Sequence, residues 1–150
     1  MELLIGNKKL TLEDLINVTR NGYEVKISEE AKEKVSIARK LVDDYVEEGK
    51  ISYGITTGFG KFSDSIISKE ETATLQRNLI ISHACGVGNP LPVDQVRGIM
   101  LLRVNNLVQG HSGIRQKVLD LLVEMINKGV TPYIPEKGSL GASGDLAPLS

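Results

Sequence analysis

The sequence is poor in the residues that mark several common protein classes. It has one cysteine, two histidines, two phenylalanines and no tryptophan among 150 residues. A single cysteine excludes an internal disulfide and suits a reducing compartment, so we expect a cytoplasmic protein. The cysteine and histidines form no cluster with metal-ligand spacing, which argues against a structural zinc site. We therefore expect no metal.

Neither positive nor negative charge predominates in the chain, and the chain has no long apolar run. Its 18 Lys and Arg residues nearly balance 19 Asp and Glu residues, which gives a net charge of −1. Such a balance predicts no basic surface for nucleic acid. No apolar stretch is long enough to span a membrane, and the first ten residues lack the pattern of a signal peptide. We expect neither nucleic acid nor a membrane as partner.

Hydrophobic periodicity and capping signals predict a mainly α chain with short strands and loops. Two short apolar stretches, 3–5 and 8–10, suggest a hairpin around Gly6-Asn7, and residues 23–27 alternate like a strand. Prolines predict an extended stretch over 130–135. The first expected helix begins after Thr11, and the second runs from Ser28 to about Glu48. The third runs from Ser68, with Glu71 completing a capping box, to near His83, and the fourth from Val93 to Val108. The fifth is capped by Ser112 and ends at Gly129, and a sixth begins after Asp145.

The expected helices differ in how their apolar residues are arranged. In the helix 28–48, one buried stripe is predicted by residues at helical spacing: Val35, Ala38, Leu41, Val42 and Tyr45. The charges on its other side are best explained as a solvated face. The run 99–102, Ile-Met-Leu-Leu, is apolar over more than one stripe. Its helix is therefore expected to be buried on several sides.

Residues 138–148, Gly-Ser-Leu-Gly-Ala-Ser-Gly-Asp-Leu-Ala-Pro, are able to make an electrophile from the chain itself. In a sharp bend, the amide nitrogen of Gly144 reaches the carbonyl carbon of Ala142. Loss of one water closes a five-membered ring, and loss of a second from the Ser143 side chain leaves an exocyclic methylidene. Gly144 has no Cβ to obstruct the bend, and Ala142 is small enough for its carbonyl to be attacked.

Three glycines alone are also typical of a turn that leads into a helix and cradles a phosphate. The full string is more specific, and it resembles the prosthetic-group loop of the histidine and phenylalanine ammonia-lyase family. The resemblance implies a methylidene-imidazolone (MIO) formed from Ala142-Ser143-Gly144, with no metal or nucleotide. It also implies the N-terminal part of the ammonia-lyase/fumarase-like helical fold, and a homotetramer for the full-length enzyme.

A second segment, residues 52–60 (Ser-Tyr-Gly-Ile-Thr-Thr-Gly-Phe-Gly), places a phenol in a glycine-rich loop. A tyrosine packed under a turn is the simpler reading of this segment alone. Together with the first motif, the segment resembles the family's inner lid loop, which closes over the substrate. The resemblance implies that Tyr53 is the catalytic base and that Gly60 binds substrate. A phenol acts as a base only where positive potential, such as a helix N-terminus, favours its ionised form.

A third segment, residues 78–88, carries Ser82-His83 near the end of an expected helix. A histidine on an apolar helix is most often a core or surface residue. Here the Ser-His pair resembles the substrate-selecting position of the histidine-specific members, which implies that both residues bind substrate. An imidazole facing an imidazole substrate discriminates through hydrogen bonds. The neighbouring Cys85 is expected to be a small buried apolar residue.

The resemblance implies removal of ammonia from L-histidine to give trans-urocanate, the first step of histidine degradation. Residues 1–150 then form an N-terminal domain that ends just after the Ala-Ser-Gly loop, without the central helical bundle. Ser143 and Tyr53 are the expected catalytic residues. Two alternatives stay open: an ammonia-lyase or aminomutase for another aromatic amino acid, and a catalytically inert fragment.

Overall fold

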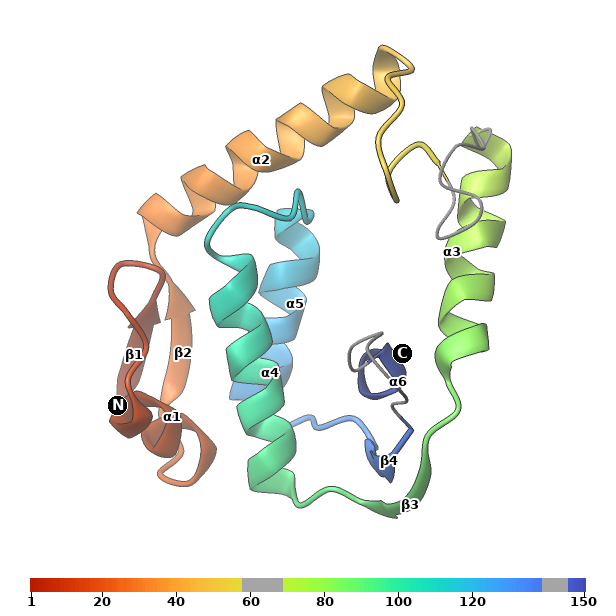
Figure 1. The fold of residues 1–150 in the computed structure, drawn as a ribbon. Helices are drawn as coiled ribbons and strands as arrows, with labels where there is room; N and C mark the ends of the chain where they lie inside the picture. The colour runs from red at the N-terminus through yellow and green to blue at the C-terminus, as the bar shows by residue number, and fades with distance from the viewer. Residues whose placement is uncertain (58–68, 139–145) are drawn as a thin grey trace. The chain divides into compact units, whose positions relative to one another are not determined.

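The structure is a computed structural model that describes residues 1–57, 69–138 and 146–150, of which the side chains of 69–73 are not described. The chain forms two compact units. The first comprises residues 1–41 and 92–132, and the second comprises residues 42–91 and 133–150. Figure 1 shows that most of the chain is helical, with four short strands among the described residues. The mainly α fold expected from the sequence is therefore confirmed.

The first unit begins with two parallel strands, β1 (Glu2–Ile5) and β2 (Glu24–Ile27). Each strand alternates exposed and buried residues, so its apolar side chains lie on one face. Leu3 pairs with Val25 and Ile5 with Ile27 in the register of the sheet. The expected hairpin of residues 3–5 with 8–10 is wrong, because the partner of β1 is the strand that follows the first helix.

Helix α1 (Leu12–Thr19) joins the two strands and begins directly after Thr11, as expected, with a capping box that was not predicted from the sequence. The hydroxyl of Thr11 accepts a hydrogen bond from the Asp14 amide, and the Asp14 carboxylate accepts one from the Thr11 amide, both at 3.1 Å. Helix α2 (Glu29–Glu47) follows β2 directly. The hydroxyl of Ser28 accepts from the Ala31 amide at 3.2 Å, which confirms Ser28 as its cap.

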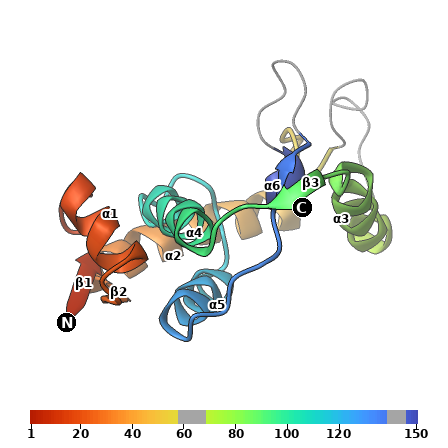
Figure 2. The same ribbon diagram turned by 90° about the horizontal axis from the view of Figure 1, so that it is seen from below.

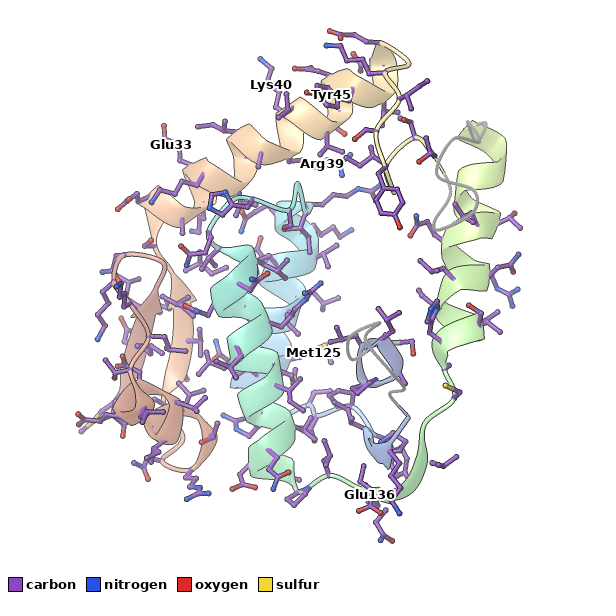
Figure 3. The ribbon with its side chains drawn as sticks, viewed as in Figure 1. Glu33, Arg39, Lys40, Tyr45, Met125 and Glu136 are labelled. Atoms are coloured by element: carbon purple, nitrogen blue, oxygen red, sulfur yellow. The ribbon has the colours of Figure 1, made fainter. Side chains whose placement is uncertain are left out.

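The buried stripe predicted on α2 is only partly confirmed. Val35 is 1% exposed, whereas Leu41 is 53% exposed. Figure 3 shows Glu33 and Lys40 on one side of α2 and Arg39 on another. The Arg39 guanidinium donates to the carbonyl oxygen of Gly113 at 3.3 Å. Of the charged residues expected on a solvated face of α2, Glu30, Lys34 and Glu48 are exposed and Asp44 is half-buried.

Helix α4 (Val93–Leu107) packs against α1 and against α5 (Gln116–Asn127), and α5 in turn packs on β2. Figure 2 shows α4 and α5 nearly end-on and side by side. Met100 and Leu101 of α4 are at most 4% exposed, but the neighbouring Leu102 is 51% exposed. Burial on more than one side therefore holds only for part of the run 99–102.

Helix α5 begins three residues later than expected, and Ser112 does not cap it. Its N-cap residue is Arg115, which makes no side-chain capping bond. Gly113 has a φ of +64°, a left-handed conformation that interrupts any helix starting at Ser112. The expected end is confirmed, since Lys128 is the C-cap and Gly129 follows it with a φ of +68°.

The second unit contains α3 (Lys69–His83), β3 (Val87–Pro90), β4 (Pro135–Lys137) and α6 (Leu146–Leu149). Strands β3 and β4 pair antiparallel, with an irregularity between Val87 and Pro90. Residues 130–134 before β4 belong to neither a helix nor a strand. The Ser68 cap proposed for α3 lies outside the described residues. No helix in the described part of the chain is both long and apolar enough to cross a membrane.

Candidate active site

Tyr53 lies in a tight turn that threonine side chains hold in place. The carbonyl oxygen of Ser52 accepts hydrogen bonds from the amides of Ile55 at 3.1 Å and Thr56 at 3.0 Å. The Thr56 hydroxyl accepts from the Ser52 amide at 2.8 Å and donates to the carbonyl of Lys50. The segment is thus a turn, as expected, and its tyrosine side chain is 63% exposed.

The cation nearest in sequence to this turn is already neutralised. The Lys50 ammonium lies 2.6 Å from the Glu48 carboxylate and 4.9 Å from the centre of the Tyr45 ring. The hydrogen bond to Glu48 raises the pKa of Lys50 above its ordinary value, so the pair is ionised and has no net charge at neutral pH. The positive potential that a phenolate requires does not come from this pair.

Ser82 and His83 share a carbonyl at the last turn of α3. The Ser82 hydroxyl donates to the Leu79 carbonyl oxygen at 2.8 Å, and Nδ1 of His83 lies 2.7 Å from the same oxygen. Because a carbonyl oxygen only accepts, Nδ1 must carry the proton in this contact. In a neutral His83, Nε2 is then a hydrogen-bond acceptor. The carbonyl of a helix end therefore selects the tautomer of the ring.

The residues directly after His83 approach the start of the Ala-Ser-Gly loop. Cys85 is exposed, and its sulfur lies 3.7 Å from the carbonyl oxygen of Gly138. The expectation of a buried Cys85 is therefore wrong, because α3 ends at His83 and the chain turns along β4 instead of entering a core. The Leu91 amide donates to the Ile134 carbonyl at 2.8 Å and extends this contact beyond the strands.

The far end of the loop returns to the same place. Ala147, in α6, is the side chain nearest to the Cα hydrogens of Gly138, where an added methyl group would lie 2.8 Å from its Cβ. The described residues on either side of segment 139–145 are therefore neighbours.

The structure places some of the expected site residues and leaves others outside its description. Tyr53, Ser82 and His83 belong to the same compact unit. Gly60, Ala142, Ser143 and Gly144 lie outside the described residues. Sequence reasoning assigned no role to Gly86, which touches both Pro135 and Gly138. The sequence feature that could have pointed to Gly86 is the pair of glycines on either side of Val87, close to the Ser-His pair.

Within residues 1–57, 69–138 and 146–150, no group of three or more His, Cys, Asp or Glu side chains is arranged to hold a metal ion. The described part of the site instead offers a phenol, a hydroxyl and an imidazole. These groups suit proton transfer and hydrogen bonding to a small polar molecule.

Comparison with known proteins identifies relatives along the whole chain. The sequence profile of the family described as aromatic amino acid lyase matches residues 10–150. Histidine ammonia-lyase of Alkaliphilus oremlandii is 68% identical over 149 residues, and histidine ammonia-lyase 1 of Fusobacterium nucleatum is 65% identical over 150 residues. These matches cover 99% and 100% of this chain, but only 29% of the length of each relative.

Solved structures share the fold. The crystal structure of ergothionase, an ergothioneine-degrading enzyme of Treponema denticola, superimposes with a TM-score of 0.92 at 40% identity. The match covers 99% of this chain and 30% of the ergothionase chain. The helices and short strands described above are thus those of a fold already seen in an enzyme.

Proposed function

Because this chain belongs to the aromatic amino acid lyase family, we propose that it is the N-terminal part of an enzyme that removes ammonia from L-histidine to give trans-urocanate. Two relatives at 65% and 68% identity bear the name histidine ammonia-lyase, and this supports the choice of substrate. In this proposal the reaction is the first step of histidine degradation. The central helical bundle and the remaining active-site groups belong to the part of the enzyme beyond residue 150.

The prosthetic group proposed for this site is a methylidene-imidazolone made from Ala142, Ser143 and Gly144. The closeness of Gly138 to Ala147 supports it, because ring formation between nearby residues of the segment is compatible with ends that lie side by side. Such a group supplies an electrophilic methylidene carbon, which turns the substrate's amino nitrogen into a better leaving group. No metal and no nucleotide take part in this scheme.

Tyr53 is the proposed base that removes the proton from the β-carbon of the substrate. Its exposure of 63% leaves the phenol accessible to a bound ligand, and the Thr56 hydrogen bonds fix the backbone that carries it. Gly60, in the same glycine-rich segment, is proposed to bind substrate, since a residue without a side chain lets a ligand approach the backbone closely.

The observation that carries the choice of histidine is the contact between Nδ1 of His83 and the Leu79 carbonyl at 2.7 Å. With the proton on Nδ1, Nε2 of His83 accepts a hydrogen bond from an N–H donor. The imidazole ring of histidine offers that donor, and the ring of phenylalanine offers none. Ser82 supports this geometry, because its hydroxyl lies 3.1 Å from Nδ1 and donates to the same carbonyl.

We propose that the full-length enzyme is a cytoplasmic homotetramer. Several large apolar side chains in the first unit are about half exposed, among them Leu102 at 51%, Val118 at 49% and Leu121 at 56%. Apolar surface of this kind is typical of contacts with further protein. In this proposal it is covered by the remainder of the enzyme or by other subunits.

The proposal is tested by the ultraviolet absorbance of the unsaturated acid that the full-length enzyme forms from each member of a panel of histidine, phenylalanine, tyrosine and ergothioneine. We expect the highest kcat/KM for histidine, and loss of about 10²–10⁴-fold in kcat on Tyr53→Phe, the usual size of a general-base contribution. Tyr23→Phe, in the first unit, is the matched control and is expected to keep full activity. A higher kcat/KM for another member of the panel would contradict the choice of substrate.

A fragment of residues 1–150 alone is expected to make no urocanate, since in this proposal most of the active site lies beyond it. Turnover by the purified fragment would contradict this division of the enzyme.

A further inference from the structure

We propose that Thr56 is a positioning residue for Tyr53, and that its hydroxyl ties the turn carrying Tyr53 to the end of helix α2. The inference rests on the proposed function, since it concerns the base of that reaction. It assigns to Thr56 no contact with the substrate, only an effect on where the Tyr53 phenol lies.

The Thr56 hydroxyl makes two hydrogen bonds with main-chain groups that come before Tyr53. It accepts from the Ser52 amide at 2.8 Å and donates to the Lys50 carbonyl oxygen at 2.5 Å. A hydroxyl has one proton to donate and two lone pairs that accept, so a single side chain serves both groups at once. Because Ser52 directly precedes Tyr53, the first of these bonds fixes the main chain where the tyrosine begins.

The second bond connects the turn with α2. The Lys50 amide donates at 3.0 Å to the carbonyl oxygen of Tyr45, which lies in the last turns of that helix (Figure 3). Gly49, between them, has a φ of +65°, the left-handed conformation with which helices commonly end. Hydrogen bonds therefore lead from the end of α2 through Lys50 and Thr56 to the residue before Tyr53.

The link to α2 is separate from the bonds that close the turn itself. The Ser52 carbonyl accepts from the amides of Ile55 and Thr56, and Gly54 between them has a positive φ of +70°. These bonds join main-chain groups alone, so they do not depend on the side chain at position 56. Loss of the Thr56 hydroxyl is thus expected to leave the turn formed and to release it from α2.

The link matters because the main chain decides much of where the phenol lies. The Tyr53 side chain is 63% exposed, so the described residues bury little of its ring. A general base has to lie within hydrogen-bond reach of the proton that it removes, and a displacement of about 1 Å costs up to about 10²-fold in rate. A turn tied to a helix holds the base in place before the substrate arrives.

The test is urocanate formation from histidine by the full-length enzyme carrying Thr56→Val, which keeps the shape of the side chain and removes both hydrogen bonds. We expect kcat to fall by about 10- to 100-fold, the factor that two hydrogen bonds of ordinary net strength amount to, with little change in KM. Thr56→Ala removes the same bonds with a smaller side chain and is expected to show the same loss. Thr56→Ser keeps the hydroxyl and is expected to retain most of the parent kcat.

The matched control is Thr19→Val in the first unit. The Thr19 hydroxyl also donates to a main-chain carbonyl, that of Leu15, at 2.8 Å, and its side chain is half-buried like that of Thr56. We expect this variant to keep the parent kcat. Circular dichroism checks that each variant is folded.

A double variant shows whether Thr56 acts through Tyr53. Once Tyr53→Phe has removed the base, Thr56→Val has no base left to position and is expected to lower the remaining rate no further. The inference would be overturned by a parent-like kcat in Thr56→Val, by equal losses in Thr56→Val and Thr56→Ser, or by the same fold loss with and without the Tyr53 hydroxyl. Full activity of Tyr53→Phe would instead refute the proposed base.

Discussion

The side chain of Asn127 is joined to the main chain of Val25 by two hydrogen bonds. Its Oδ1 accepts from the Val25 amide at 2.8 Å, and its Nδ2 donates to the Val25 carbonyl at 2.9 Å. Asn127 is the last residue of α5, and Val25 lies in β2 with 1% of its surface exposed. One amide side chain therefore takes the place that a third strand would have at this point of the sheet.

Asn127→Ala is expected to lower the free energy of unfolding by about 1–3 kcal/mol, because it leaves two buried backbone groups of Val25 without partners. Urea denaturation followed by circular dichroism measures the change. The control is Asn21→Ala, which removes an exposed side-chain hydrogen bond to Asn17 and is expected to cost less than about 0.5 kcal/mol. Equal losses in the two variants would show that the bonds to Val25 add nothing specific.

Gly110 and Gly129 illustrate two different physical reasons why a position requires glycine. Both have a positive φ, +74° and +68°. A methyl group on Gly129 meets nothing within 4 Å, whereas one on Gly110 would lie 2.8 Å from the backbone carbon of Lys34. We expect Gly129→Ala to cost about 1 kcal/mol for backbone conformation alone, and Gly110→Ala to cost about 1–3 kcal/mol more for overlap with α2. Melting temperatures that fall equally would contradict this order.

The capping box of α1 makes stability depend on pH. The hydrogen bond from the Thr11 amide, followed by that from the Thr11 hydroxyl, holds the pKa of Asp14 below its ordinary value of 3.8. The folded state therefore favours the ionised carboxylate. Its contribution is complete above the ordinary pKa and is lost as the pH falls through the lower pKa of the folded state.

Asp14→Asn is expected to cost about 0.5–1 kcal/mol at neutral pH, since charge-assisted hydrogen bonds are replaced by weaker ones. The difference between parent and variant should shrink as the pH is lowered below 3.8. Denaturation curves at neutral and at acid pH measure it. A difference that stays constant, or grows, in acid would show that the carboxylate charge is not the cause.

His83→Leu is expected to lower kcat/KM for histidine by about 10- to 100-fold in the full-length enzyme, the size of a lost hydrogen bond to substrate. The kcat/KM for phenylalanine, whose ring has no N–H donor, should change little. Ser82→Ala is the comparison variant and should have a smaller effect, because its hydroxyl contacts Leu79 and the His83 ring within α3. Equal losses for both substrates would indicate a structural role for His83.

The helix boundaries that were predicted correctly depend on local signals in the sequence. Thr11 and Ser28 cap α1 and α2 because a hydroxyl reaches an amide only three residues away. Gly129 ends α5 for a similar reason, since its own positive φ closes the helix. The motifs that identify the family are local as well, because the proposed ring needs Ala142, Ser143 and Gly144 in direct succession.

The predictions that failed depended on partners distant in the chain. Residues 3–5 looked like one arm of a hairpin, but their apolar side chains pair with Val25 and Ile27, which are brought close by α1. Cys85 looked like a core residue, but it is exposed and contacts Gly138, which lies 53 positions further along the chain. Nothing in the neighbouring residues indicates either partner.

The sequence by itself determined the family and where most helices start and stop, because each of these depends on residues within a few positions of one another. Only the tertiary structure decided that β1 and β2 are parallel, that Asn127 completes their hydrogen bonding, and that Gly86, Gly138 and Ala147 meet. Such contacts depend on how whole helices and strands pack. The sequence shows only where a glycine stands. The atoms around it in the folded chain show whether a side chain at that position would fit.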